Sequence, residues 1–240
     1  LATVRVSRAS ADQRRGRAGR LEPGVCYRLW DEPETRSLRP FEVPEIQSAD
    51  LAGLVLDCAS WGVTEPGALT WLDPPPQAAL DLAKRELAEL GAVSGDGRIT
   101  ELGARLRGIA LPPRLAAMVL RAALLGQAEE AAAIAAVIVE RGLGGSAVDL
   151  EERLRGFRRD KGQRAQGMRR LIRAWVDTAK ASSVLEARGT GHGSDKRSPS
   201  GLLAFAYPDR IAKSRGAAGE FVLANGRGGR MDSIEQLATA

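Results

Sequence analysis

The spacing of apolar residues along the chain predicts mainly helices. Apolar side chains repeat every three or four positions, which is the periodicity of a helix that buries one face. Four stretches show this repeat, with the following inward-facing residues: Leu51, Leu54, Val55 and Cys58; Leu80, Ala83, Leu87 and Leu90; Leu115, Met118, Val119 and Ala122; Ala131, Ile134, Ala135 and Ile138. Gly62 and Gly91 follow the first two stretches and are suited to end helices. Residues 149–181 predict a long basic helical region, broken near Gly162.

A period of two predicts β-structure near the start of the chain and at one internal turn. Val25, Tyr27 and Leu29 occupy every second position of residues 25–30, which predicts a strand. Residues 92–100 predict a small hairpin, because the sequence Gly-Asp-Gly at its centre supplies the positive φ angles of a tight turn. The order helix, helix, hairpin over residues 46–100 is typical of a winged helix.

The last part of the chain changes character. Residues 187–200 have the glycine and serine content of a flexible linker. This linker contains His192, and because no ligand partners lie near this single histidine, we expect no metal site in the chain. Residues 202–212 and 220–231 predict β segments, and Asn225-Gly226 marks a turn within the second of them.

Helix starts are expected where a side chain or a proline ring suits the first turn. A short helix over residues 11–18 takes Ser10 or Asp12 as its cap, and Gly19 and Gly24 interrupt it. Elsewhere the expected helix starts are marked by three residues: Asp73, Thr100 and Pro113.

Composition indicates a soluble, folded chain. Its 240 residues suffice for one large domain or for two to three small ones, and 44% are hydrophobic. The sequence contains no run of about 18 apolar residues, as a membrane helix requires, and residues 1–20 lack the apolar stretch of a signal peptide. Cys26 and Cys58 do not suggest a disulfide framework. We therefore expect a cytoplasmic protein without a membrane partner.

Positive charge is unevenly distributed, although the net charge is only +5. Six arginines crowd residues 5–20 against the single acid Asp12, and a second basic cluster spans Arg153 to Arg173. Such patches favour a polyanionic partner, either nucleotide phosphates or a nucleic-acid backbone. A solvated helix face is the alternative, and it competes seriously for the second cluster.

The first cluster has the residues of a phosphate site. Residues three apart on a helix share a face, so Gln13, Arg17 and Arg20 are predicted to converge, with Arg14 beside them. Gly16 and Gly19 would place no side chain on that face, so that a bulky ligand can approach the backbone. Guanidinium groups offer planar sets of donors to phosphate oxygens, and an arginine finger stabilises a transferring phosphoryl group.

The residues that hold a nucleotide are missing from the sequence. No G-x-x-x-x-G-K-[ST] loop is present, and the glycines of residues 142–147 lack the lysine of such a loop. No acidic pair follows an apolar strand to hold magnesium. We therefore expect that the chain by itself does not hydrolyse ATP, and that it begins within a domain.

Residues 13–20, QRRGRAGR, resemble motif VI of the DEAH/RHA class of superfamily 2 RNA helicases, whose pattern is Gln-Arg-x-Gly-Arg-x-Gly-Arg. Residues 23–30 are similar to the strand that closes the second RecA-like domain of that family. The later similar segments follow the domain order of the family: 44–62, 71–80 and 90–106 resemble its winged helix, 111–120 its helical bundle, and 149–159 and 206–228 the bacterial HrpB-type branch.

The resemblance implies a multidomain, mainly α fold. The implied order is the end of a RecA-like α/β domain in 1–31, a linker in 32–43, a winged helix in 44–110, a ratchet-like helical bundle in 111–186, a linker in 187–200 and the start of a small β domain, OB-like, in 201–240. It also implies that the P-loop, the DExH motif and the RNA-channel motifs lie before residue 1.

The resemblance further implies roles for individual residues. Gln13 would position or sense the water at the γ-phosphate, and Arg17 and Arg20 would be arginine fingers. Arg14 would be a supporting contact to phosphate or to neighbouring motifs, beside Gly16 and Gly19, whereas Arg15 stands at the variable position of the motif. The implied ligands are ATP with Mg²⁺, bound mainly by the preceding domain, and RNA, with DNA left open.

Three alternatives remain. The arginines of residues 14–20 could form a surface ion-pair network with Glu22, Glu32 and Glu34. The chain could also be a non-catalytic nucleic-acid-binding module whose footprint is the second cluster, or a protein-interaction fragment with alanine-rich helices. Within the second cluster the candidate nucleic-acid contacts are Arg153, Arg155, Arg158, Arg159 and Lys161. Aromatic residues make up only 4% of the chain, so contact with the nucleic-acid backbone is favoured over base stacking.

Overall fold

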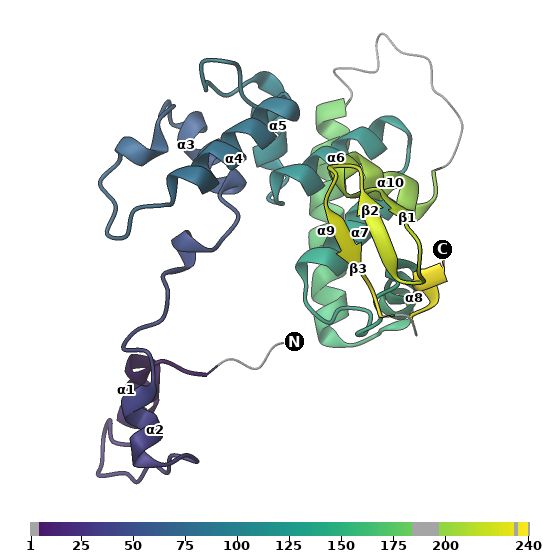
Figure 1. Ribbon diagram of the computed structural model, residues 1–240. Coiled ribbons are helices and arrows are strands. Elements are labelled where there is room, and N and C mark those ends of the chain that lie inside the picture. The colour runs from purple at the N-terminus through teal and green to yellow at the C-terminus, as the bar shows by residue number, and fades with distance from the viewer. Residues whose placement is uncertain (1–4, 184–196, 233–234, 240) are drawn as a thin grey trace.

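The computed structural model describes residues 5–183, 197–232 and 235–239. His192 and most of the linker predicted over 187–200 lie outside these ranges. The described part of the chain is mostly helical and carries one small sheet near its C-terminus (Figure 1). Within it, no helix combines the length and the apolar character that crossing a membrane requires.

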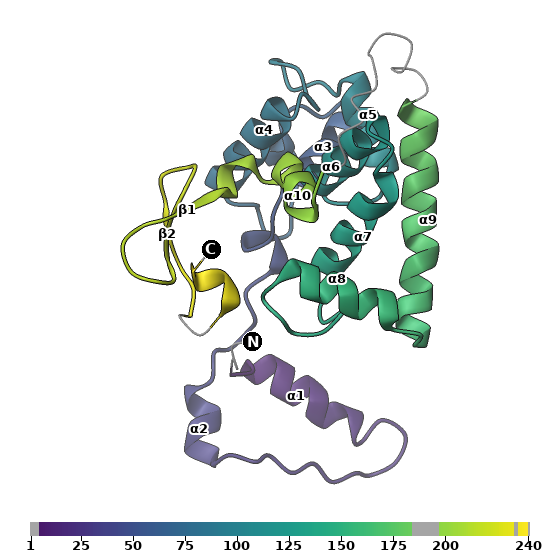
Figure 2. The same cartoon turned by 90° about the vertical axis from the view of Figure 1, so that its right-hand side faces the viewer.

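Two short helices form an N-terminal unit that lies apart from the other helices (Figures 1 and 2). Helix α1 spans Arg8–Arg17 and helix α2 spans Glu32–Ser37. The cap of α1 is Ser7, whose hydroxyl accepts a hydrogen bond from the Ser10 amide at 3.1 Å. The prediction of Ser10 or Asp12 as the cap was therefore wrong, because the helix begins earlier and both residues lie inside it. Helix α2 lies within the predicted linker over 32–43 and has no buried residue.

Residues 25–30 do not form the predicted strand. Val25, Tyr27 and Leu29 are 75%, 85% and 94% exposed, and no hydrogen bond joins the backbone of residues 19–30 to another backbone group in the described chain. A strand requires a neighbour that accepts and donates these bonds. The described residues place no such neighbour beside this segment, so the alternating pattern is present without the sheet that would explain it.

The next unit runs from residue 45 to residue 108 and contains the helix–helix–hairpin order predicted from the sequence. Its elements are the 3₁₀ turn Glu45–Gln47, α3 (Ala52–Ser60), the 3₁₀ turn Pro66–Ala68, α4 (Gln77–Glu89) and α5 (Glu101–Gly108). Helix α3 packs against both α4 and α5. A bridge between Val93 and Ile99 closes the small hairpin that connects α4 to α5.

Local signals for the ends of these helices are largely confirmed. Gly62 and Gly91 have φ angles of 82° and 73°, the left-handed conformation that favours glycine after a helix. Thr100 caps α5 by accepting from the Gly103 amide at 3.0 Å. Asp73 does not cap α4, because that helix begins only after Pro76 and has no side-chain cap.

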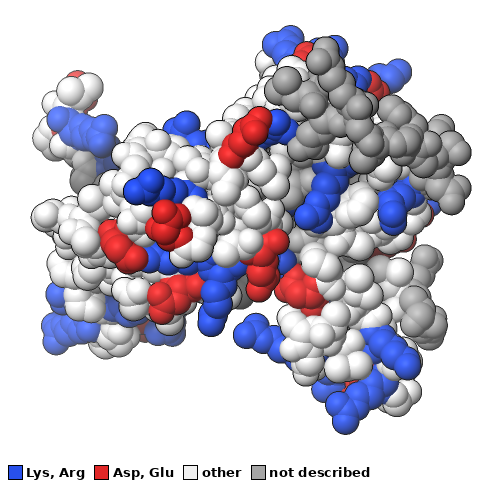
Figure 3. All heavy atoms as spheres, turned by 90° about the horizontal axis from the view of Figure 1, so that it is seen from above, with Lys and Arg blue, Asp and Glu red and all other residues white. Residues whose placement is uncertain are grey.

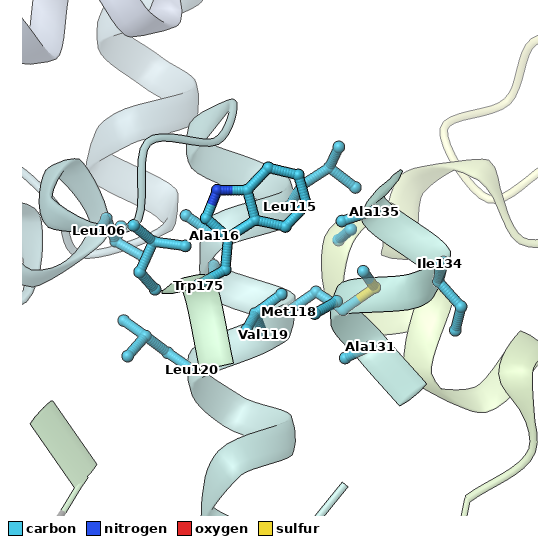
Figure 4. Packing of buried hydrophobic residues seen from close by; sticks show 14 of the residues in the cluster. Leu106, Leu115, Ala116, Met118, Val119, Leu120, Ala131, Ile134, Ala135 and Trp175 are labelled. Atoms are coloured by element: carbon cyan, nitrogen blue, oxygen red, sulfur yellow. The ribbon is translucent and has the colours of Figure 1, made fainter. Parts of the chain in front are cut away.

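Five helices form the largest unit. They are α6 (Pro113–Leu124), α7 (Ala128–Val139), α8 (Leu150–Arg159), α9 (Gln163–Ser183) and α10 (Pro199–Ala206). Helix α6 contacts α5, α7, α9 and α10, and the predicted inward residues of α6 are all buried. Figure 4 shows the side chain of Trp175, from α9, lying over α6. Helix α7, which carries Ala131, Ile134 and Ala135, lies beside α6 in the same view. The break between α8 and α9 falls near Gly162, as predicted.

The C-terminal segment is helical where the sequence predicted its first β segment. Residues 202–206 lie in α10 and residues 208–210 in the 3₁₀ turn Pro208–Arg210, because Ser198 caps α10 and Pro199 suits its first turn; only Ala212, at the end of the predicted segment, belongs to a strand. The second β segment is confirmed. Strands β1 (Ala212–Ser214), β2 (Glu220–Leu223) and β3 (Gly228–Arg230) form an antiparallel sheet in that order, and Gly226 turns with a φ of 81°. A 3₁₀ turn, Gln236–Thr239, follows the sheet.

Arg114, in the first turn of α6, joins three parts of the chain. Its Nε lies 2.9 Å from Glu86 of α4, and its Nη1 lies 2.6 Å from Asp209 after α10. The guanidinium also lies over the Tyr207 ring, 5.7 Å from its centroid. Burial raises the pKa of Glu86 above its usual value. At Asp209 burial also acts to raise the pKa, but the hydrogen bond and the charge of Arg114, together with smaller contributions that include Arg210, lower the pKa of that carboxyl group overall.

Removing Arg114 is expected to destabilise the fold in a pH-dependent way. Arg114→Leu leaves Glu86 half-buried without its counter-charge, so we expect the free energy of unfolding to fall by about 2–4 kcal/mol at pH 7. The folded-state pKa of Glu86 would rise further. The penalty for ionising it, and hence the loss of stability, would therefore be smaller at pH 4.5 than at pH 7. Urea unfolding at both pH values measures this. The double variant Arg114→Leu/Glu86→Gln should recover part of the stability, and a destabilisation independent of pH would contradict the role assigned to Glu86.

Two helical glycines offer a matched test of packing. A Cβ at Gly103 of α5 would fall against the carbonyl oxygen of Ala92 and 2.9 Å from Cγ1 of Ile99, whereas a Cβ at Gly53 of α3 meets nothing within 4 Å. We expect Gly103→Ala to destabilise by about 1–3 kcal/mol through overpacking. Gly53→Ala should stabilise by up to about 1 kcal/mol through helix propensity. Thermal unfolding followed by circular dichroism distinguishes the two, and equal midpoints would refute the close approach at Gly103.

Candidate nucleotide and nucleic-acid sites

Helix α1 presents most of the predicted phosphate-binding residues on its surface. Gln13, Arg14 and Arg17 are exposed, and Arg17 follows Gln13 by four positions and Arg14 by three, so its side chain neighbours both on the helix surface. Arg20 lies beyond the helix, which ends at Arg17 with Ala18 as its C-cap. The prediction that Arg20 shares the helical face was therefore wrong. Arg20 is carried instead by the turn that follows.

Packing within the chain does not explain the glycines of the motif. A Cβ at Gly16 would meet nothing within 4 Å, and one at Gly19 would meet only the carbonyl oxygen of Glu22, at 3.9 Å. Gly24 differs, because a Cβ there would overlap the carbonyl oxygen of Ala18. Gly24 thus lets the chain fold back against the end of α1, whereas Gly16 and Gly19 leave open surface beside the arginines.

Three acids near α1, which are Asp12, Glu32 and Glu34, are paired with other bases. Asp12 lies 2.5 Å from Arg28 and 3.9 Å from Arg15, and two further pairs involve neighbouring acids: Glu34 with Arg5 at 2.7 Å and Glu32 with Arg36 at 3.2 Å. Within the described residues, the side chains of Gln13, Arg14, Arg17 and Arg20 form no hydrogen bond or ion pair. The ion-pair network with Glu22, Glu32 and Glu34 is not formed. Three guanidinium groups therefore remain available to an external anion.

The second basic cluster divides into arginines used within the fold and basic side chains that face solvent. Arg153 donates to the carbonyl oxygen of Val137 near the end of α7, and Arg158 lies 2.5 Å from Glu130. Arg155, Arg159 and Lys161 are exposed, and their side chains have no hydrogen bond or ion pair within the described chain. Arg155, Arg159 and Lys161 are therefore the members of the cluster that are available to contact an anionic partner.

Two more arginines of the cluster bind carbonyl oxygens at helix ends. Arg169 donates to the carbonyl oxygens of Phe157 and Asp160, at 2.9 and 2.6 Å, and lies 5.1 Å from the centroid of the Phe157 ring. Arg164 bonds to Glu140 and to the carbonyl oxygen of Arg141, just after α7. The last carbonyl groups of a helix lack partners within it. The sequence analysis missed this role, because each arginine reaches a helix end that is distant along the chain.

The two candidate sites are separate surfaces. Helix α1 lies apart from α8 and α9 in both ribbon views (Figures 1 and 2). On the face shown in Figure 3, basic and acidic side chains are interspersed and do not form one positive field. On this face, recognition of an anion would depend on local groups of unpaired bases, because no continuous positive surface is seen there.

Comparison with known proteins finds similarity to helicases over the whole chain, although no family model matches it. The chain is 37% identical to the ATP-dependent RNA helicase HrpB of Escherichia coli over 238 residues, which are 99% of this chain and 27% of that protein. The probable ATP-dependent RNA helicase DHX34 of mouse is 37% identical over 133 residues, which are 55% of this chain and 12% of that protein.

Solved structures give the same result. Two crystal structures of E. coli HrpB, one described as a DExH-box NTPase and the other as a DEAH/RHA helicase, match 100% of this chain with TM-scores of 0.67 and 0.71 and identities of 35% and 36%. Each match covers 28% of the solved chain. The chain thus spans about a quarter of the length of these relatives.

Charge reversal can test the outer bases of the second cluster. Replacing Arg155, Arg159 and Lys161 together by Glu should weaken binding of single-stranded RNA and reduce the slope of log K against log salt by roughly 0.7 for each phosphate that is no longer neutralised. Fluorescence anisotropy at several salt concentrations measures both quantities. Arg158→Glu is the comparison, since it opposes Glu130 and should lower stability more than binding. Unchanged affinity and slope in the triple variant would identify a solvated face.

Proposed function

From its similarity over its whole length to the HrpB-type DEAH/RHA helicases, we propose that this chain is the C-terminal region of an ATP-dependent RNA helicase. The comparisons confirm the resemblance first seen in residues 13–20 and in the segments that follow them. In this proposal the chain supplies arginine fingers to an ATP site and accessory units to an RNA channel. The first RecA-like domain of the same protein supplies the rest of the ATP site.

One observation carries the proposed chemistry: the arginines Arg14, Arg17 and Arg20 are exposed and form no ion pair or hydrogen bond within the described residues, while Asp12, Glu32 and Glu34 are paired with other bases. Arg17 and Arg20 would approach the γ-phosphate and stabilise the charge that develops during phosphoryl transfer, an effect of about 10³–10⁵ in rate. Gln13, on the same helix, would orient the attacking water through its side-chain amide. Arg14 would support the phosphate contact, and Gly16 and Gly19 would leave room for it.

The residues that the structure describes offer no cluster of side-chain ligands for Mg²⁺. Among the described residues, no group of three or more His, Cys, Asp and Glu side chains could hold a metal ion. Guanidinium groups repel a cation and bind phosphate oxygens. We therefore assign contacts with the phosphates of ATP to this chain and contacts with the metal ion to the domain that completes the site.

The remaining units are proposed as RNA-contacting accessory domains. The unit of α3–α5 with its hairpin would be the winged helix of 44–110, and α6–α9 would be the ratchet-like bundle of 111–186. The β domain, OB-like, would begin after α10 instead of at residue 201, since Leu202 and Ala206 of α10 are buried in the same core as α6. Arg155, Arg159 and Lys161 would contact the RNA backbone.

Substitution of the arginine fingers in the full-length protein tests this proposal. Arg17→Ala or Arg20→Ala should lower the kcat of RNA-stimulated ATP hydrolysis by about 10³-fold or more, because the charge of the transition state loses a donor. The dissociation constant for ATP should change much less, since other residues hold the nucleotide. Steady-state hydrolysis and fluorescent-nucleotide binding measure the two effects.

Arg15→Ala is the matched control. Arg15 belongs to the same helix but faces Asp12 at 3.9 Å, and its removal should leave turnover near that of the native protein. The present chain by itself should hydrolyse no ATP. Undiminished turnover in Arg17→Ala would refute the finger assignment and favour a non-catalytic nucleic-acid-binding module, which the unpaired bases of α8 would also suit.

A further inference from the structure

The first turn of α1 is capped by the connection that leads to α3. The backbone amide of Arg8 donates to the carbonyl oxygen of Arg39 at 2.7 Å, and that of Ala9 donates to the carbonyl oxygen of Pro40 at 3.0 Å. The amide of Ser7 donates to Oε1 of Glu42 at 2.8 Å. The first amides of a helix have no partner within the helix. Residues 39–42 supply those partners.

Glu42 is the charged member of this cap. Its Oε2 lies 3.4 Å from Nη2 of Arg39, so the two carboxylate oxygens contact different segments of the N-terminal unit. A carboxylate at a helix N-terminus interacts favourably with the partial positive charge there. The pKa of Glu42 is lowered, first by the hydrogen bond from the Ser7 backbone and to a smaller extent by the charges of Arg39 and Arg14. Ser7 itself is fully buried.

The capping segment is close in sequence to the next unit. Residues 43–51 separate Glu42 from the start of α3, and even fully extended they span only about 30 Å. Pro44 and the 3₁₀ turn Glu45–Gln47 shorten and stiffen this connection. A displacement of α1 that keeps its cap therefore moves the point from which the connection to α3 begins.

The cap is specific to Glu42 among the acids of the connection. Glu45, three positions later, is exposed, and its side chain makes no hydrogen bond or ion pair within the described residues. The two glutamates thus share a segment, a charge and an exposed position, but only one of them contacts the helix that carries Gln13 and Arg17. The connection is tied to α1 at one defined place.

We propose that Glu42, with the carbonyl groups of Arg39 and Pro40, is a positioning element that couples the arginine helix to the α3–α5 unit. The inference rests on the proposed function and adds a physical connection through which the ATP site and the α3–α5 unit affect each other. When phosphate contacts shift α1, the capped connection shifts with it and changes the placement of α3–α5 on RNA. By reciprocity, RNA bound to α3–α5 changes the placement of Arg17.

Kinetic measurements on the full-length protein test the coupling. Glu42→Ala removes the acceptor, and we expect the ratio of RNA-stimulated to basal kcat to fall about tenfold, within the range of mutations that alter coupling between sites. The KM for ATP should stay within about threefold, because nucleotide-holding residues lie elsewhere. Glu42→Gln keeps an oxygen that accepts from the Ser7 amide and should retain most of the stimulation. Glu45→Ala should retain all of it.

Hydrogen exchange on the same proteins tests the cap itself. Glu42→Ala should accelerate exchange at the amide of Ser7 and its neighbours in the first turn of α1, while Glu45→Ala should not. A melting temperature within a few degrees of the native value would separate this local effect from global unfolding. Unchanged exchange in Glu42→Ala would overturn the cap, and an equal reduction of stimulation in Glu42→Ala and Glu42→Gln would overturn its assignment to the hydrogen bond.

Arg17→Ala, measured in parallel, separates this inference from the proposed function. If Arg17→Ala abolishes hydrolysis while Glu42→Ala keeps full stimulation by RNA, the coupling is wrong and the finger role stands. If Arg17→Ala retains hydrolysis, the proposed function fails before the coupling is considered.

Discussion

A charged group that is largely removed from water must be neutralised by its neighbours, and Arg114 at the start of α6 is such a group, with only 20% of its side chain exposed. Eight of the twelve residues of α6 are buried, yet its first turn contains Arg114. A guanidinium group stays charged under all ordinary conditions, so it needs acidic partners. Glu86 and Asp209 come from elements on either side of α6 in the sequence. The requirement to neutralise one arginine thus specifies where α4 and the C-terminal segment attach.

The parts of the fold that depend on nearby residues could be predicted from the sequence. Apolar repeats located α3, α4, α6 and α7, and the endings at Gly62 and Gly91 follow from local backbone preference. The strand at 25–30 could not be judged in this way, because a strand exists only with a partner, and alternation says nothing about the partner. Helix α10 could not be distinguished from a strand by its apolar residues, because a short apolar run suits a strand or a buried helix equally; the local signal for the helix is its start at Ser198 and Pro199.

The candidate site shows the same division. The affinity of arginine for phosphate is a property of the side chain, so the chemistry of Arg14, Arg17 and Arg20 could be inferred from residue type and spacing. The contact of Ser7 with Glu42 joins residues 35 positions apart and has no local signature. The same holds for Arg169, which binds the end of α8 from another helix. Which bases remain free for a ligand depends on such contacts, and these emerge only in three dimensions.

The backbone of residues 19–30, which forms no hydrogen bond with other backbone groups of the described chain, also affects how this polypeptide behaves in solution. An extended segment with Val25, Tyr27 and Leu29 open to water offers unpaired amide and carbonyl groups to any other strand, which is the hallmark of an aggregation-prone edge. A shorter polypeptide that starts at residue 44 would omit this edge together with α1 and α2. It would keep the whole core from Leu51 to Ala206 and should be the more tractable sample for crystallisation or solution NMR.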